Sequence, residues 1–193
     1  MSQSRTPVLD EASLTTDQKA VFDKIKAGPR GRVEGPLRIW VQSPELADRA
    51  QALGQFARFD SSLPPDLSEL AILVTARIWG SGFEWAQHAP IALRSGISQA
   101  TVADIGKGQR PTDLPDLQQA VFDVAVALHR DHRIDDAVYA QAQKTLGTRA
   151  LVDLVGICGY YTLISMTINA FDVPDGDGPT LPKADKHPHE MFR

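Results

Sequence analysis

The chain has 193 residues, 42% of them hydrophobic and 23% charged, which is enough for one globular domain with a sizeable core. A formal net charge of −4 argues against nucleic acid as a partner. The single cysteine, Cys158, excludes an intramolecular disulfide, a CxxC redox pair and a cysteine-rich zinc site. The N-terminus, MSQSRTPVLDEASLTTDQ, contains no hydrophobic signal segment, so we expect a cytoplasmic protein.

The N-terminal region is expected to contain an arm, a helix and a loop. Residues 1–13 are polar and predict a flexible arm. Thr15 and Gln18 have the spacing of a capping box and predict a short helix that ends at Gly28. The following segment to Pro36, GPRGRVEGP, predicts a loop. It is a poor candidate for a phosphate-binding loop, because no strand precedes it and no Gly-Lys-Thr/Ser sequence ends it.

The next stretch, residues 37–41 (LRIWV), is interpreted as short and extended, which as a strand would place Arg38 and Trp40 on one side. Ser43-Pro44-Glu45 has the residue order of a helix start. That helix is expected to run to about Phe59. Its predicted core-facing stripe consists of Leu46, Ala50, Leu53 and Ala57.

Residues 67–97 contain most of the side chains suited to chemistry, in two helical patterns separated by glycines. The first pattern is apolar nearly all round, which predicts a buried helix. It includes Glu69 and Arg77, whose charges are costly to bury unless they are paired or used. In the second pattern, Glu84 and His88 are four residues apart and project from the same face. The alternatives are a surface salt bridge and a proton-transfer pair, and the nearby Glu69 favours the latter.

The C-terminal half is predicted to continue with helices. Ser98 caps a short helix, and apolar residues recur at helical spacing from Leu117 to Leu128. His129 and His132 follow at its polar end, where cations beside a helix C-terminus are a commoner arrangement than metal ligands. We therefore expect no metal site. Another amphipathic helix covers Asp135–Leu146 and stops at a glycine.

Residues 151–171, LVDLVGICGYYTLISMTINAF, form the most hydrophobic segment, long enough to span a membrane. Asp153, Asn169 and two glycines dilute it, and no basic anchor flanks it, so a buried central or interface helix is expected instead. The Pro/Gly/Asp-rich residues 173–193 predict an extended tail. Because no strand pattern of any length remains, the predicted fold is all-α, with a domain at residues 14–172.

Two runs carry a resemblance to a known family: LPPDLSELAILV at residues 63–74, and FEWAQHAPIALRSGIS at residues 83–98, preceded by Trp79-Gly80. They resemble the carboxymuconolactone decarboxylase family, which is similar in fold to the alkylhydroperoxidase D proteins. The resemblance extends from about Gly35 through Phe171. It implies an all-helical domain that forms homo-oligomers, trimers or hexamers, with active sites at or near subunit interfaces.

The peroxidase branch of this superfamily carries CxxC seven and four residues before the histidine, and these positions are Ser81 and Glu84 here. Neither side chain forms a disulfide, and Cys158 lies far away in sequence. Thiol peroxidase chemistry is therefore disfavoured. The remaining acid/base cluster matches the decarboxylase branch better.

The resemblance thus implies a cofactor-independent lyase that removes CO2 from a carboxylated lactone or a related aromatic-degradation intermediate. The candidate catalytic residues are Glu69, Glu84 and His88. The candidate residues for binding the anionic substrate are Arg77, Arg38, Trp40, Trp85 and Ser81, with a structural role as the alternative for either arginine. Isomerisation, hydration or lactone opening at the same site stays open, as does a non-enzymatic helical oligomer with a buried polar network. A pocket beside His88 would favour an enzyme.

Overall fold

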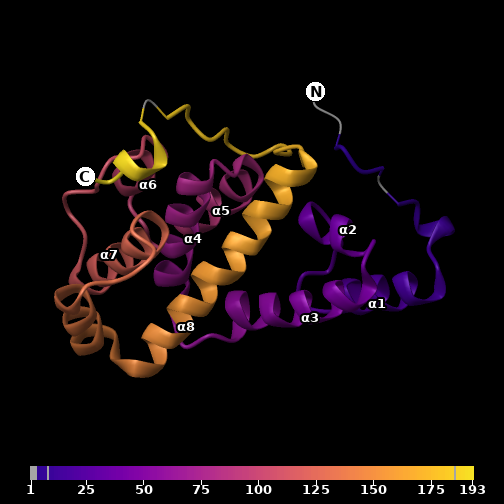
Figure 1. The fold of residues 1–193 in the computed structure, drawn as a ribbon, viewed down its shortest axis with the longest axis horizontal. Helices are drawn as coiled ribbons and strands as arrows, with labels where there is room; N and C mark the ends of the chain where they lie inside the picture. Colours follow the sequence, from indigo (N-terminus) through magenta and orange to yellow (C-terminus); the bar gives the residue numbers. More distant parts are fainter. Residues whose placement is uncertain (1–3, 8, 185) are drawn as a thin grey trace.

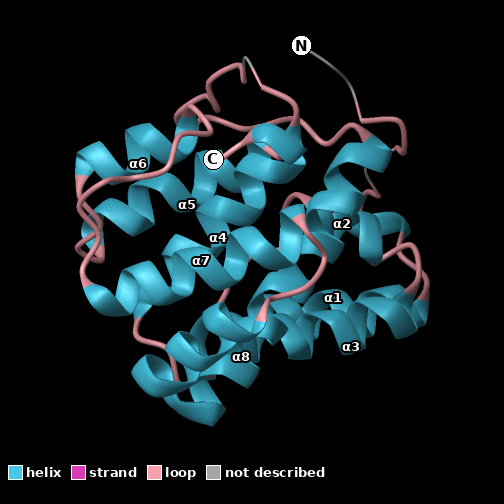
Figure 2. Cartoon of the chain, turned by 60° about the vertical axis from the view of Figure 1, so that its left-hand side comes forward, coloured by secondary structure: helices cyan, strands magenta, loops and turns pink. Residues whose placement is uncertain are grey.

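The computed structural model describes residues 4–7, 9–184 and 186–193, and these residues contain helices but no strand, so the all-α prediction is confirmed. The α-helices are α1 (Thr16–Ala27), α2 (Pro36–Trp40), α3 (Pro44–Gln55), α4 (Pro65–Trp79), α5 (Gly82–Arg94), α6 (Gln99–Gly106), α7 (Asp116–Arg130) and α8 (Asp136–Phe171) (Figures 1 and 2). A π-helical turn, Phe56–Asp60, continues α3, and 3-10 turns cover Glu11–Ser13 and Pro188–Glu190.

Helix α4 is the centre of the fold and packs against α5, α7 and α8. It begins with Pro65 in its first turn and ends at Gly80, which adopts the left-handed conformation with φ 61°. Every residue from Leu67 to Ile78 is buried, as an apolar pattern on all sides predicts. A charged side chain on this helix, such as Glu69, is therefore held inside the protein.

Helix α8 consists of two pieces, residues 136–146 and 148–171, because Gly147 has the non-helical angles φ 78° and ψ 167°. The sequence predicts a break at the same glycine, and this is confirmed. The second piece crosses the molecule diagonally, between α4–α7 and the N-terminal helices (Figure 1). By length and composition α8 resembles a membrane span, but 61% of its most apolar stretch is buried inside the protein. That burial is typical of a core helix.

Two details of the N-terminal half differ from the sequence predictions. Residues 37–41 are not extended, because Pro36 in the first turn, with its fixed φ, begins helix α2. Arg38 and Trp40 therefore point in different directions. In α3, Leu46 and Leu53 are 44% and 46% exposed and do not belong to a core-facing stripe.

The buried face of α3 is instead lined by smaller or polar residues, namely Ala47, Ala50, Gln51 and Gly54. A Cβ atom on Gly54 would overlap the Tyr160 hydroxyl and the Arg30 guanidinium. The helix thus packs through small side chains, since only these let α8 and the loop before α2 approach closely.

Among the described residues of the C-terminal tail, the only helical segment is the turn Pro188–Glu190. Its end is nevertheless part of the core, because Met191 and Phe192 are each only 2% exposed. The Phe192 ring packs edge-on against the Phe122 ring, with centroids 5.3 Å apart. The backbone N–H of Phe192 donates to the Gly108 carbonyl at 2.9 Å. The polar composition of the tail did not indicate this packing.

Candidate active site

The two helices on either side of Gly80 bring the three candidate catalytic residues together. On α5, the His88 ring lies between two carboxylates: its Nδ1 is 2.7 Å from Glu69 Oε2, and its Nε2 is 3.3 Å from Glu84 Oε2. All three side chains are buried, with exposures of 3–4%. Glu69 comes from α4, whereas Glu84 lies one turn before the histidine on α5.

The state of His88 follows from this environment. Burial on its own would lower the pKa of the imidazole, but the charge and hydrogen bond of Glu69, followed by those of Glu84, outweigh burial and raise the pKa to about 9. Both ring nitrogens face carboxylate oxygens, so a doubly protonated ring donates a proton on each side. At neutral pH the site therefore holds an imidazolium between two acidic side chains.

A small pocket of about 60 Å³, partly open to solvent, lies beside His88. Helix α5 contributes Phe83, Glu84, Gln87 and His88 to its wall, and α8 contributes Tyr160, Tyr161 and Ile164. The Tyr161 ring stands edge-on to His88 with centroids 5.1 Å apart, and Tyr160 stands edge-on to Tyr161 at 5.3 Å. Burial raises the pKa of Tyr160 to about 12 and that of Tyr161 well above its usual value, so both phenols stay neutral.

The opposite wall comes from the segment before α2 and from the π-helical turn after α3. These elements place three arginines, Arg30, Arg32 and Arg58, at the pocket. Gly35 has a φ of 54°, and a Cβ there would overlap the Phe83 ring, so glycine lets this loop lie directly on α5. None of these arginines is among the site residues predicted from the sequence. For Arg30 and Arg32 the available signal was the basic composition of the GPRGRVEGP loop, and for Arg58 the sequence offered no such signal.

The candidate residues divide into two groups by their access to the pocket. Glu84 and His88 line it, whereas Glu69 contacts the imidazole from behind. Glu69 is thus placed to orient and charge the histidine, and Glu84 and His88 are placed to exchange protons with a bound molecule.

Arg77, a predicted substrate-binding residue, does not line the pocket. Its Nη1 donates to the backbone carbonyls of Gly106, at 2.9 Å, and Pro182, at 2.5 Å. The guanidinium therefore joins α4 to the end of α6 and to the C-terminal tail. Among the described residues Arg77 makes no ion pair, and its guanidinium is used to bind these two carbonyls.

The other four predicted binding residues also lie outside the pocket wall. Trp40 is buried and its Nε1 donates to Thr167 Oγ1 at 2.9 Å, while Arg38 Nε donates to the Val33 carbonyl at 3.0 Å. Trp85 is 4% exposed and packs against Gly106. Ser81 is fully buried before α5, and its hydroxyl has no partner among the described residues.

Two further residues, Cys158 and His129, lie in surroundings typical of a structural role. Cys158 is 3% exposed, does not line the pocket, and burial raises the pKa of its thiol to about 12. His129 is not the exposed cation that its place at the end of α7 suggested. Its Nε2 lies 2.8 Å from Thr75 Oγ1, and burial, with a smaller contribution from His132, lowers its pKa to about 4.

Comparisons with known proteins agree with this architecture. Residues 44–127 match the model of the carboxymuconolactone decarboxylase family. No curated protein matches the chain in sequence. A crystal structure described as an alkylhydroperoxidase AhpD core, an uncharacterized peroxidase-related protein from Ralstonia eutropha JMP134, superposes with a TM-score of 0.71 at 17% identity, covering 90% of this chain and 93% of that one.

A second solved structure, an uncharacterized peroxidase-related protein from Silicibacter sp. TM1040, gives a TM-score of 0.68 at 14% identity. It covers 98% of this chain and 96% of that chain. At these identities the structural likeness establishes the fold alone. Residues 44–127, which supply both Glu69 and the Glu84–His88 pair, thus match the carboxymuconolactone decarboxylase family, and the helical fold is like that of the AhpD core structure.

Proposed function

We propose that this protein is a cofactor-independent lyase that decarboxylates a carboxylated unsaturated lactone or a related aromatic-degradation intermediate, as the family name suggests. The observation that carries the proposal is the imidazolium of His88, which is held between Glu69 and Glu84 and lines a pocket that arginines also line. This arrangement supplies a proton and a place for an anion, which are the two needs of the reaction.

Decarboxylation breaks the bond between the carboxylate and the neighbouring carbon. CO2 leaves, and the electron pair passes into the conjugated carbonyl to give a dienolate. A proton from His88 Nε2 then forms the new C–H bond, and solvent returns a proton to the imidazole. Stabilising the developing dienolate charge and delivering that proton are the steps that the imidazolium accelerates.

Glu69 and Glu84 have different tasks in this scheme. Glu69 holds Nδ1–H at 2.7 Å, fixes the orientation of the ring and keeps it charged. Glu84 faces the pocket as well as Nε2, and its bond is the longer one at 3.3 Å. The proton on Nε2 is therefore more easily transferred to the substrate than the proton on Nδ1. Glu84 lies beside it and can stabilise the imidazolium charge or relay the replacement proton.

The names of the structural neighbours raise peroxidase chemistry as another function, and the thiol of this chain argues against it. Cys158 is the only sulfhydryl, and a thiol with a pKa of about 12 is almost entirely protonated at neutral pH. It does not line the pocket that holds His88. We therefore do not propose a thiol peroxidase.

An isomerase is the second candidate, because Glu84 and His88 both line the pocket. One carboxylate and one imidazolium beside the same substrate suffice to remove a proton at one carbon and add another elsewhere. A non-enzymatic role for the polar cluster is less favoured, since the cluster borders open space instead of a filled contact.

The test is a screen of carboxylated γ-lactones and β-keto acids for CO2 release. The wild type is expected to release CO2, and in D2O the product should carry one solvent deuterium at a carbon of the former dienolate. His88→Gln should lower kcat/KM by roughly 10²–10⁴-fold, the usual contribution of a general acid. Deuterium uptake without CO2 would identify the isomerase, and undiminished turnover by a folded His88→Gln protein would refute the assigned role.

A further inference from the structure

The pocket wall contains guanidinium groups that the acid/base chemistry does not use. Arg32 is exposed and already paired, with Nε 3.2 Å from Glu34 Oε2 and Nη2 donating to Gln87 Oε1 at 3.1 Å. Arg30 and Arg58 differ, since neither has a carboxylate within 4.0 Å among the described residues. Two unneutralised cations thus border the same pocket.

Arg30 is held in place without having its charge neutralised. Its Nη2 donates to the Tyr160 hydroxyl at 3.1 Å, and this pair lies over Gly54, where a side chain would displace both groups. Its Nε is buried and has no hydrogen-bond partner in the part of the chain that the structure describes. A buried guanidinium N–H without an acceptor is costly, unless a ligand supplies the acceptor.

Arg58 approaches the pocket from the π-helical turn, on another element. Its guanidinium carbon lies 5.2 Å from the centroid of the Phe59 ring, and it makes no hydrogen bond to any described side chain. Its charge acts on both Tyr160 and Tyr161. Arg30 and Arg58 therefore converge on the tyrosine pair, whose other end stands against the His88 ring.

We propose that Arg30 and Arg58 form an anion subsite, which binds a carboxylate that the substrate retains while its reacting carbon lies at His88. This deepens the proposed function and rests on it for the reaction, although not for the binding. A guanidinium presents a fork of N–H donors that matches a carboxylate. Arg30 also lies outside the segment 44–127 that matches the family, so the N-terminal loop contributes specificity of its own.

Energetics decide which carboxylate the arginines hold. The carboxylate that leaves as CO2 loses its negative charge in the transition state, so a strong ion pair with it would stabilise the bound substrate more than the transition state. A retained carboxylate keeps its charge throughout and contributes uniform binding. The favoured substrates thus carry two anionic groups, one lost at His88 and one retained by the arginines.

The binding test uses succinate, a dicarboxylate, with uncharged succinamide as the control ligand, measured by titration calorimetry. The wild type should bind succinate and not succinamide. Arg58→Gln and Arg30→Gln should each weaken succinate binding by about tenfold or more. Arg49→Gln removes the same charge on α3, where Arg49 pairs with Glu45 away from the pocket, and should bind like the wild type. Arg58→Gln loses no hydrogen bond, so it tests the subsite even if Arg30→Gln folds poorly.

On an active substrate, Arg58→Gln should raise KM about tenfold with little change in kcat, the signature of lost uniform binding. Succinate binding that is absent from the wild type, or equal in the wild type and Arg58→Gln, would overturn the subsite. Failure to release CO2 from every lactone, with arginine-dependent succinate binding intact, would refute the proposed reaction and leave the subsite standing.

Discussion

At the scale of single residues, the titration of His88 links the site to stability. Its folded-state pKa of about 9 lies above the ordinary value of 6.5, because Glu69 and Glu84 outweigh the effect of burial. Folding therefore favours the protonated ring. The stabilisation is complete below about pH 6.5 and is lost as the pH rises through about 9.

We accordingly expect the melting temperature of the wild type to fall between pH 6.5 and pH 9.5, a range that spans both values. His88→Gln, which has no group titrating there, should show a flatter profile over the same range. Differential scanning calorimetry at matched ionic strength measures both. Parallel curves for the two proteins would contradict a raised pKa.

Replacing each of the two glutamates, Glu69 and Glu84, is expected to change the kinetic constants in a different way. Glu69→Gln removes the charge that contributes most to the raised pKa of His88, so the alkaline limb of the kcat/KM profile should move to lower pH with KM nearly unchanged. Glu84→Gln acts at the pocket and should lower kcat itself. If Glu69→Gln leaves the pH profile unchanged, Glu69 does not tune the histidine.

For Cys158 we expect no catalytic role. Cys158→Ser exchanges a buried thiol for a hydroxyl of similar size, close to Thr75. The activity of this variant should equal that of the wild type, and neither protein should consume hydroperoxide in the presence of a dithiol. Peroxidase turnover that disappears in Cys158→Ser would overturn this assignment.

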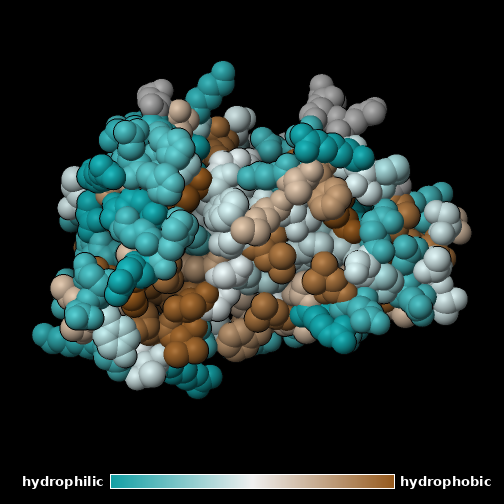
Figure 3. Space-filling view, in the orientation of Figure 1, coloured by the Kyte–Doolittle hydropathy of each residue, from teal (hydrophilic) through white to brown (hydrophobic). Residues whose placement is uncertain are grey.

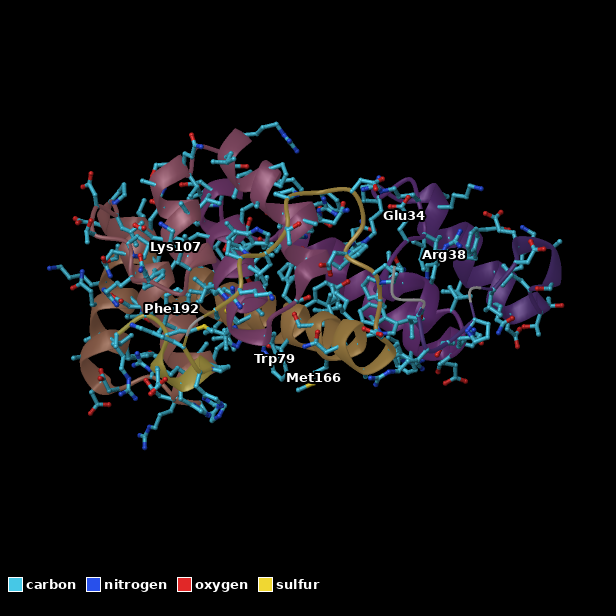
Figure 4. All side chains as sticks on the ribbon, turned by 90° about the horizontal axis from the view of Figure 1, so that it is seen from above. Glu34, Arg38, Trp79, Lys107, Met166 and Phe192 are labelled. Atoms are coloured by element: carbon cyan, nitrogen blue, oxygen red, sulfur yellow. The ribbon has the colours of Figure 1, made fainter. Side chains whose placement is uncertain are left out.

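At the scale of elements, the contacts that anchor the C-terminal tail include two with buried residues of the core. Arg77 binds the carbonyl of Pro182, and Phe192 packs against Phe122 in the core. Figure 4 places Phe192 beside Lys107, at the end of the molecule remote from Glu34 and Arg38. The anchor therefore stabilises the α6–α7 region and not the arginine wall of the pocket.

Phe192→Ala should lower the free energy of unfolding by about 3 kcal/mol, because it empties a buried aromatic site. Arg193→Ala changes the exposed neighbouring residue and is the matched control. Urea denaturation measures both variants. A loss below about 0.5 kcal/mol for Phe192→Ala would show that the end of the tail contributes little.

At the scale of the whole molecule, helix α8 leaves an apolar stripe uncovered. Val152, Val155 and Met166 recur on one face and are 63%, 46% and 48% exposed, and Gly156 and Gly159 lie beside them. Figure 3 shows hydrophobic side chains over the face that carries α8, and in Figure 4 Met166 projects outward next to Trp79. Exposed apolar surface of this kind marks interaction sites.

We therefore expect a homo-oligomer that buries this stripe, a trimer or hexamer by the family resemblance. Light scattering should give a multiple of the 21.0 kDa chain mass. Val155→Glu should shift the protein toward smaller species, whereas Gln109→Glu, an exposed change near the end of α6, should not. A monodisperse 21.0 kDa wild type at micromolar concentration would contradict this prediction.

The sequence by itself determined the helical fold and the acid/base cluster, because both depend on short-range spacing. The capping box at Thr15, the break at Gly147 and the common face of Glu84 and His88 are set by residues within one or two turns. The predicted cluster included Glu69 because a charge on a buried helix needs a partner. In the structure that partner is His88.

Only the tertiary structure decided which side chains reach the pocket. Arg30 donates a hydrogen bond to Tyr160, which is 130 residues away in the sequence. Arg77 donates to backbone carbonyls of α6 and of the C-terminal tail. An arginine side chain is long and finds partners through packing between distant segments, which local periodicity does not encode. Likewise, the burial of Phe192 depends on a site that α7 provides, so composition alone predicted only an extended tail.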